Sequence, residues 1–182
     1  MSSIEQLIRQ RRTIHDFEPE PIDQSIVTQA LDTAVWAPNH KLSEPWRFYH
    51  IGPETKQAIC QLNATLVTEK KGKEAGQKKL HRWMGIPGWL AVTCIQSSDP
   101  LRRQEDYAAC CCVIHNLSLL LWDQGIGMKW STGPVTRDAR FYDLIWADPQ
   151  REKVVSLIWY GKPAKTPTPG RKPAETFTVN LD

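Results

Sequence analysis

Two consecutive arginines followed by a hydroxyl stand near the start of the chain, as Arg11-Arg12-Thr13. The planar fork of donors in an arginine matches the oxygens of a phosphate, so this triplet could hold an anion. The same residues fall at the end of an expected first helix, where cations complement the helix dipole. The pattern is therefore typical of either an anion clamp or a solvated helix end.

A short polar segment, Asn39–Glu44, lies between Pro38 and Pro45. Both prolines restrict the backbone, so the donors and the cation of this segment are presented at low entropic cost. Trp36 and Trp46 flank it with flat apolar surface. This mixture of groups suits a planar, partly polar ligand.

Other constellations give weaker indications. Gly125-Ile-Gly127 is half of a dinucleotide fingerprint, but Trp130 occupies the place of the third glycine and the glycines follow a helix, which argues against a Rossmann site. Contiguous cysteines at 110–112 point in different directions on a helix, which favours packing over a metal site with His115. No nucleophile elbow, P-loop or paired-carboxylate motif is present. We therefore expect a cofactor to supply the chemistry and name no catalytic residue.

The composition is that of a single soluble domain spanning residues 1–182. The chain is 41% hydrophobic, enough for a sizeable core, and its net charge of +3 is too small to require a nucleic-acid partner. Five cysteines and no signal peptide indicate a reduced, cytoplasmic protein. The basic stretch at 69–82 lacks interleaved aromatics, so we expect a solvated helix end or mobile loop there.

The pattern of apolar residues predicts an α+β fold in which helices cover a sheet. Strands are expected at Arg47–Ile51, Trp89–Gln96, Met128–Trp130 and Val154–Tyr160. Helices are expected at Ser2–Arg12, Asp23–Ala34, from Pro53 to about Leu66, and Asp138–Trp146.

The segment Asp106–Gln124 is apolar nearly all round. It is long enough to span a membrane, but its polar residues and the absence of a second span favour a fully buried core helix. A chain of this size has little mass to surround such a helix, so we expect a homodimer. From about residue 163 a proline-rich arm should follow, and Thr176–Val179 could add a strand to its own sheet or to that of a neighbouring subunit.

Taken in order, these motifs resemble the nitroreductase family of FMN flavoproteins, and within it the compact bacterial branch of NAD(P)H nitroreductases. The resemblance rests on Arg11-Arg12-Thr13, on Ala37–Lys41 with Glu44-Pro45-Trp46, on Gly125-Ile-Gly127, on Trp130–Gly133 and on Tyr160–Pro163. It covers nearly the whole chain. Each motif is weak alone, and the combination is specific.

The resemblance implies a homodimer whose central, mostly antiparallel sheet is flanked by helices, with the buried helix at the dimer interface. FMN would bind at that interface, be reduced by NADH or NADPH, and pass electrons to a nitroaromatic, quinone or similar acceptor in ping-pong fashion. By motif match, Arg11, Arg12 and Thr13 would hold the phosphate, Trp36 and His40 would lie against FMN, and Trp130, Ser131 and Thr132 would line its other side. Leu120–Gly125 matches a region associated with nicotinamide binding.

This chain departs from the family pattern at three places. Its loop reads Asn39-His40-Lys41 where many members carry Ser and Asn. Glu44 stands where many members have Gln, and Ser131 where the compact branch often has a basic residue. Lys162 and Arg171 in the tail are candidates for further phosphate contacts or for solvated surface. A rival reading is a flavin-binding or interaction protein on the same scaffold, without NAD(P)H turnover, whose basic segment Lys70–Arg82 meets an acidic partner.

Overall fold

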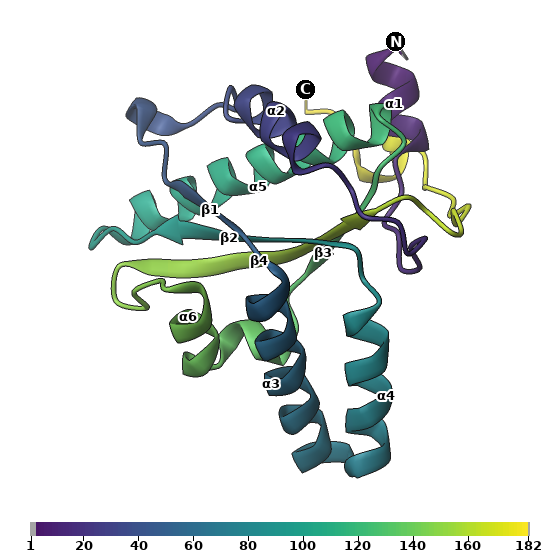
Figure 1. Ribbon diagram of the computed structural model, residues 1–182. Coiled ribbons are helices and arrows are strands. Elements are labelled where there is room, and N and C mark those ends of the chain that lie inside the picture. The colour runs from purple at the N-terminus through teal and green to yellow at the C-terminus, as the bar shows by residue number, and fades with distance from the viewer. Residues whose placement is uncertain (1–2, 182) are drawn as a thin grey trace.

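The structure, a computed structural model, describes residues 3–181 and has one antiparallel sheet between two layers of helices (Figure 1). The sheet order is β1-β2-β4-β3, with strands β1 (Trp46–His50), β2 (Gly88–Ile95), β3 (Gly127–Ser131) and β4 (Glu152–Gly161). The helices are α1 (Ile4–Gln10), α2 (Gln24–Ala34), α3 (Pro53–Lys71), α4 (Lys73–Met84), α5 (Pro100–Asp123) and α6 (Ala139–Ile145). The expected α+β class, with a central antiparallel sheet flanked by helices, is confirmed.

Strand β2 runs through the middle of the molecule and is covered on both faces. Its residues from Gly88 to Cys94 are all buried, as the unbroken apolar run predicted. Leu90 and Val92 pack with α2 and α5, whereas Trp89 and Ala91 pack with α3, α4 and α6 on the other face. The two helical layers therefore meet the sheet through alternate residues of the same strand.

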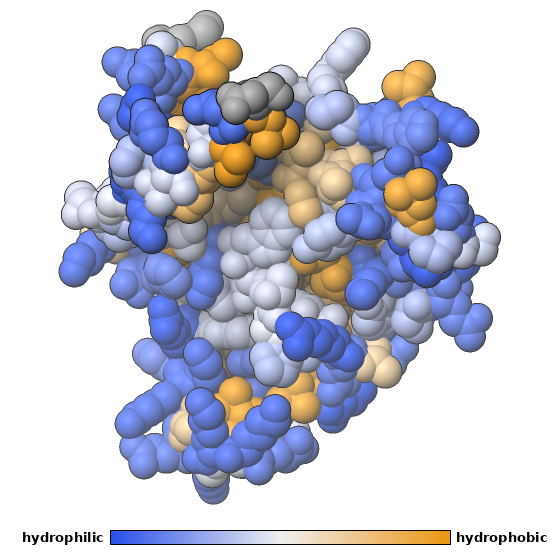
Figure 2. All heavy atoms as spheres, turned by 180° about the vertical axis from the view of Figure 1, so that it is seen from behind, coloured by the Kyte–Doolittle hydropathy of each residue, from blue (hydrophilic) through white to orange (hydrophobic). Residues whose placement is uncertain are grey.

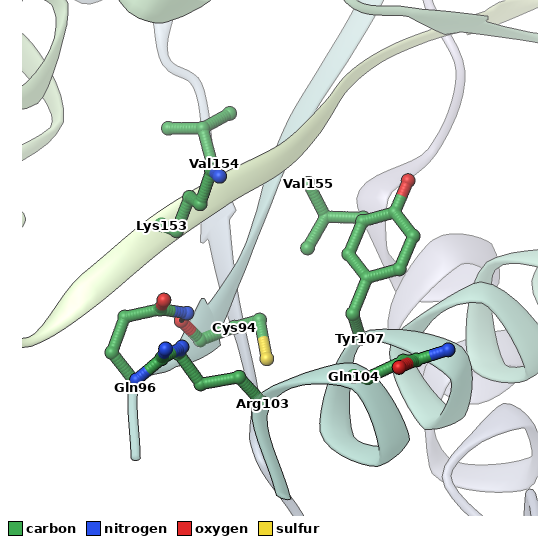
Figure 3. A pocket seen from close by; sticks show the side chains of 8 residues that line it. All are labelled: Cys94, Gln96, Arg103, Gln104, Tyr107, Lys153, Val154 and Val155. Atoms are coloured by element: carbon green, nitrogen blue, oxygen red, sulfur yellow. Dashed lines mark hydrogen bonds between the residues drawn. The ribbon is translucent and has the colours of Figure 1, made fainter. Parts of the chain in front are cut away.

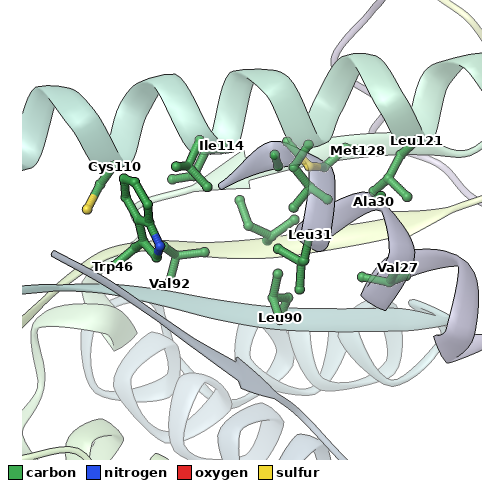
Figure 4. Close-up of a cluster of buried hydrophobic side chains, with 14 of the residues drawn as sticks. Val27, Ala30, Leu31, Trp46, Leu90, Val92, Cys110, Ile114, Leu121 and Met128 are labelled. Carbon is green, nitrogen blue, oxygen red and sulfur yellow. The ribbon is translucent and has the colours of Figure 1, made fainter. Parts of the chain in front are cut away.

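Helix α5 lies lengthwise across the first of these faces. Asp99 caps its N-terminus, and the Asp99 side chain accepts a hydrogen bond from the Leu101 amide at 2.9 Å. Its buried stripe includes Cys110, Ile114 and Leu121, which point down onto the sheet beside α2 (Figure 4). This contact forms the larger of the two buried clusters.

The opposite side of α5 is open in the single chain, whereas the burial that we expected for this helix included a second subunit. Tyr107 is 49% exposed, and Cys112 and His115 are also exposed. The reason is geometric, since a sheet contacts one stripe of a helix and α2 covers one flank only. Nowhere between residues 3 and 181 does a helix combine the length and apolarity needed to cross a bilayer.

The basic stretch at 69–82 is helical, so of our two expectations, a solvated helix end or a mobile loop, the mobile loop is wrong. Helix α3 continues to Lys71, and after Gly72 the chain turns back as α4. The two helices form a long antiparallel hairpin that projects away from the sheet (Figure 1). Leu62 and Trp83 on its inner side are buried, which explains why a strongly charged sequence folds into paired helices.

After β4 the tail passes back over the N-terminal segment. The Glu18 amide donates to the Lys162 carbonyl at 2.9 Å, and the Ala164 amide donates to the Asp16 carbonyl at 3.0 Å. A short 3-10 helix (Ala174–Phe177) follows, close to α1 (Figure 1). Up to residue 181 the tail adds no strand to its own sheet, so that one of our two expectations for it is not met.

The glycines of Gly125-Ile-Gly127 have structural tasks. Gly125 follows α5 with a φ of 73°, a conformation that L side chains rarely adopt. At Gly127 the N-terminal segment crosses β3 closely, because the Ile14 amide donates to the Met128 carbonyl at 3.1 Å. A Cβ on Gly127 would lie 2.3 Å from Cγ1 of Ile14, which is fully buried.

We therefore expect Gly127→Ala to destabilise the protein by about 1–3 kcal/mol, because the added methyl group overpacks a buried contact. The free energy of unfolding in urea measures this effect. Gly52→Ala is the matched control, since the space around Gly52 is open and its φ is −74°. Equal stabilities of the two variants would contradict the proposed close contact.

Candidate functional site

The N-terminal segment brings part of the predicted site together at the edge of the sheet. Thr13 pairs with Met128 in a short parallel bridge, which holds residues 11–14 alongside β3. Arg11, Thr13 and Trp130 then line a small cavity of about 200 Å³, which α5 closes with His115 and Ser118. Three of the residues named from sequence thus surround one space.

Two further guanidinium groups act on Arg11, which lines this cavity. The pKa of Arg11 is lowered by burial and then by the charges of Arg12 and Arg171. Lys162, the other tail cation considered from sequence, is instead 3.3 Å from a carboxylate oxygen of Glu20. Because like charges held together penalise one another, an anion bound here would relieve the repulsion.

Besides its effect on Arg11, Arg12 contacts the end of α1. This agrees with the second of the two interpretations of the arginine pair, a helix end. Its guanidinium donates to the carbonyl of Arg9 at 2.5 Å and to that of Arg11 at 2.9 Å, at the end of α1. These carbonyls have no partner within the helix. Arg12 therefore caps α1 while its charge acts on Arg11.

The polar loop between the prolines is fixed to the first turns of α5. His40 Nδ1 and a Glu105 carboxylate oxygen are 2.7 Å apart, and Ser43 Oγ donates to Asp106 at 2.7 Å. Asp106 is buried and also accepts from Arg102 at 3.1 Å. The loop is thus held by charged hydrogen bonds, which are stronger than neutral ones.

The same loop has a strained backbone. Lys41, Leu42 and Glu44 have φ values of 54°, 50° and 41°, in a region that non-glycine residues rarely occupy. Such strain costs about 1–3 kcal/mol per residue and persists only where surrounding contacts impose it. Here the contacts to α5 impose it, and they leave Leu42 81% exposed.

The two tryptophans that flank the loop differ in role. Trp36 follows the last turn of α2 and is 87% exposed, so its ring is free to contact a ligand or another subunit. Trp46 is 6% exposed and belongs to the core between α5 and the sheet. Our expectation that both rings would face the loop is therefore wrong for Trp46.

The two halves of the predicted site contact α5 at different places along its length. His40 contacts Glu105, whereas the arginine cavity contacts His115 and Ser118. At 1.5 Å per helical residue, these positions are about 15–20 Å apart. One chain therefore does not bring His40 and Trp130 to the same small ligand.

Ser131 and Thr132 do not share the small cavity. Side chains alternate along β3, so Ser131 faces the opposite side from Trp130 and lines a cavity of about 750 Å³ beneath the α3–α4 hairpin. Thr132 is exposed, and its carbonyl accepts from Arg137 at 3.3 Å. Leu120–Gly125, the segment matched to nicotinamide binding, is the last turn of α5 and the turn after it.

Sequence reasoning missed the basic residues of this larger cavity. Lys79, Arg82 and Lys129 come from α4 and β3, and burial followed by the charges of Arg82 and Lys79 lowers the pKa of Lys129. We had read the two α4 cations as solvated surface. The signal that could have found the site is Asn63, a buried amide on the apolar face of α3.

A further pocket of about 240 Å³ lies at the far end of β2 and β4 (Figure 3). Its most strongly polar group, Arg103, donates to the carbonyls of Ser97 at 2.8 Å and Ser98 at 3.1 Å. The side-chain Nε2 of Gln96 donates to the Cys94 carbonyl at 3.2 Å. These groups already have partners in the chain, so the pocket is a poor candidate for a site.

Comparison with known proteins decides the family. The model of the nitroreductase family matches residues 8–162, which include the arginine segment, the polar loop and all four strands. The chain belongs to the nitroreductase family. This makes the protein an oxidoreductase and confirms the resemblance inferred from its motifs.

Relatives of this nitroreductase cover nearly its whole length. It is 33% identical over 171 residues to the Bacillus subtilis (strain 168) protein named "Putative NAD(P)H nitroreductase YfhC", spanning 91% of this chain and 87% of that protein. A nitroreductase-like family protein from Bacillus cereus has a TM-score of 0.86 and 27% identity, covering 100% and 97% of the two chains.

The fold also matches the FMN and NADPH-dependent nitroreductase NfnB from Sphigopyxis sp. strain HMH, with a TM-score of 0.81, 15% identity and complete coverage of both chains. At this identity the likeness shows the fold alone. Arg171 lies beyond the residues that the family model matches, so its approach to Arg11 is a feature of this chain's tail.

In this nitroreductase we expect Ser43→Ala to lower the free energy of unfolding by about 1–2 kcal/mol, because it removes a donor to the buried Asp106 carboxylate. Trypsin should then cleave faster after Lys41, in the strained loop. Thr65→Ala is the control, since that hydroxyl donates to a carbonyl on the exposed side of α3. Unchanged stability and unchanged cleavage would show that the loop does not depend on this bond.

Proposed function

We propose that the protein is an FMN-dependent oxidoreductase that takes a hydride from NADH or NADPH and passes electrons, in ping-pong sequence, to a nitroaromatic, quinone or similar acceptor. The observation that carries the proposal is the cavity that Arg11 shares with Thr13 and Trp130 at the edge of β3, with the charges of Arg12 and Arg171 close enough to act on Arg11. Family membership and the name of the Bacillus subtilis relative support it. The free cysteines suit a reducing compartment, the cytoplasm.

The residues present fit FMN. Arg11 and Arg171 would hold the phosphate, Arg12 would add its charge, and the Thr13 hydroxyl is placed to donate to a phosphate or ribityl oxygen. Trp130, and Trp36 with His40, would lie against the ring, and Ser131 and Thr132 would line its far side. When bound, the flavin supplies hydride chemistry, so the chain has to orient the ring and exclude water and needs no nucleophile of its own.

We further propose that two chains form a dimer and that each FMN site takes residues from both. Within one chain, His40 and the cavity of Trp130 contact widely separated positions of α5, which supports this proposal. A second chain would bring its own loop, with His40, to the cavity of the first. The open side of α5 supports it as well. Figure 2 shows hydrophobic surface beside the two termini, where Ile4, Phe177 and Leu181 are 75%, 73% and 90% exposed.

The visible spectrum of protein purified without added cofactor tests the function, followed under anaerobic conditions after addition of NADH and then NADPH. We expect flavin absorbance that bleaches with at least one nucleotide and returns with an acceptor. If flavin is present but does not bleach, the alternative of a flavin-binding protein without turnover is correct. If FMN neither co-purifies nor binds on reconstitution, the cofactor assignment fails.

We expect Arg11→Ala to weaken FMN binding about 10- to 100-fold, because it removes a charged hydrogen bond to the phosphate. Arg12→Ala should weaken it too, through the charge acting on Arg11. Titration of the apoprotein with FMN measures both. Arg9→Ala is the control with the same loss of charge, since Arg9 pairs with Glu5 on the exposed side of α1 at 2.8 Å. Equal affinities for all three variants would refute the phosphate assignment.

A mixture of two defective chains tests the shared site. In a dimer of one Arg11→Ala chain and one His40→Ala chain, one site would have both residues intact and the other would have neither. We therefore expect refolded mixtures to regain activity towards one quarter of the wild-type level, since half of the dimers are mixed and each has one intact site of two. Activity no higher than that of the separate variants would refute sites built from two chains.

A further inference from the structure

Two thiols from different elements meet in the core at the far end of β2. Cys94 lies near the end of this strand and is 1% exposed, whereas Cys110 lies on the buried stripe of α5 and is fully buried. Both are free cysteines of the cluster between α5 and the sheet. The Cys110 thiol donates a hydrogen bond to the Cys94 sulfur, and the Cys94 thiol donates to the Ile95 carbonyl at 3.4 Å. A helix and a strand therefore present one sulfur each to the same point.

The pairing of the strands fixes the direction in which Cys94 points. Cys94 pairs with Trp46 on β1 and with Lys153 on β4. It shares the sheet face of Val92, which α5 covers, because alternate residues of a strand lie on the same face. Figure 3 shows its sulfur turned from β2 towards α5, and Figure 4 shows Cys110 pointing from α5 towards the sheet.

The pocket of about 240 Å³ at this end of the sheet connects Cys94 with solvent (Figure 3). Its polar groups have partners in the chain, so it is a poor place to hold a ligand, but Cys94 forms part of its wall. Cys110 is not among the residues that line it, so a reagent from solvent meets Cys94 first. Because Cys94 is so little exposed, only a small molecule can reach its sulfur.

The surroundings make Cys94 the more acidic of the two thiols. The hydrogen bond from Cys110 lowers the pKa of Cys94 by more than burial and the Asp106 carboxylate raise it, and the same bond raises the pKa of Cys110. Arg103 and Lys153 add two cations to the pocket wall. Since the thiolate is the form that attacks an oxidant, Cys94 is the attacking group and Cys110 the second thiol.

The other three cysteines have different surroundings. Burial raises the pKa of Cys111, whose thiol is hydrogen-bonded to Tyr107, and Cys112 is exposed. Neither follows Cys110 onto the sheet, because consecutive residues of a helix point in different directions. Cys60 belongs to the cluster on the other face of the sheet, where burial raises its pKa to about 11.

We propose that Cys94 and Cys110 form a reversible redox pair that hydrogen peroxide converts to a disulfide. The Cys94 sulfur attacks one peroxide oxygen, so that an S–O bond forms, the O–O bond breaks, and the released hydroxide leaves as water with the thiol proton. The Cys110 sulfur then attacks the Cys94 sulfur, so that an S–S bond forms, the S–O bond breaks, and the second hydroxide leaves as water with the Cys110 proton. The two thiols lose two electrons and two protons in all, and the peroxide gains them.

The disulfide links α5 to β2, the contact from which both parts of the candidate site take their positions. It also stops the oxidation of Cys94 at a reversible stage, because the sulfinic and sulfonic acids that would otherwise follow are not reduced by thiols. The inference concerns the scaffold and does not depend on the proposed function.

Peptide mapping of the whole protein, with the cofactor that it carries on purification, tests the pair. The protein is treated with hydrogen peroxide, denatured in an alkylating reagent and digested. We expect one new peptide that links Cys94 to Cys110 and is lost with dithiothreitol, while Cys60 remains alkylated as before. Alkylation of both Cys94 and Cys110, a link from Cys94 to Cys111, or a sulfinic acid at Cys94 beside a free Cys110 would each overturn the proposal.

The variant Cys110→Ser separates the two steps. Dimedone, which traps sulfenic acids, should label Cys94 about tenfold more in this variant than in wild type, because the second thiol no longer consumes the intermediate. Cys111→Ser is the matched control, since it removes the same group from the next residue of α5 and should behave as wild type. Equal labelling of Cys94 in wild type and Cys110→Ser would overturn the pair. If Cys110→Ser does not fold, the wild-type peptide map decides alone.

Glutathione disulfide tests whether the pocket restricts the size of the oxidant. It should attach glutathione to the exposed Cys112 and leave Cys94 unmodified, because the tripeptide is too large to reach a sulfur of a residue that is 1% exposed. Attachment of glutathione to Cys94 would overturn the assignment of a small peroxide as the oxidant.

Discussion

The packing of α5 on the sheet is the contact on which the rest of the molecule depends. Its buried stripe fills the larger core cluster together with β2 and α2. The polar loop is attached to its first turns through Glu105 and Asp106, and the arginine cavity is closed by residues one to two turns before its end. Each part of the candidate site therefore takes its position from one rigid helix, which suits a site that must hold a large planar cofactor in a fixed orientation.

The same helix also keeps the two parts of the candidate site, the arginine cavity and the polar loop, apart. Because its two attachment points are separated by several turns, the arginine cavity and the polar loop of one chain lie too far apart to meet the same small ligand. The strained backbone of the loop fits this arrangement, since contacts with α5 keep a polar segment projecting instead of letting it relax onto its own core.

The α3–α4 hairpin shows how stability and binding can oppose one another. Its inner side packs well, with Ile59, Leu62 and Trp83 buried, yet the wall that it presents to β3 collects cations and leaves two buried donors unpaired. Mutual repulsion of Lys79, Arg82 and Lys129 is a cost in the empty protein and becomes an attraction when an anion enters.

Local patterns in the sequence determined most of the elements, because the period of apolar residues, the caps and the prolines act over a few residues. The four strands, α2, α6 and the end of α5 follow from such patterns, and so does the exposed position of Trp36. Only the tertiary structure decided what depends on distant segments. It buried Trp46, brought Arg171 to Arg11, turned the basic stretch into a second hairpin helix, and placed Lys129 among cations from α4. It also left one side of α5 open, because how much of an apolar helix is covered depends on which elements pack against it.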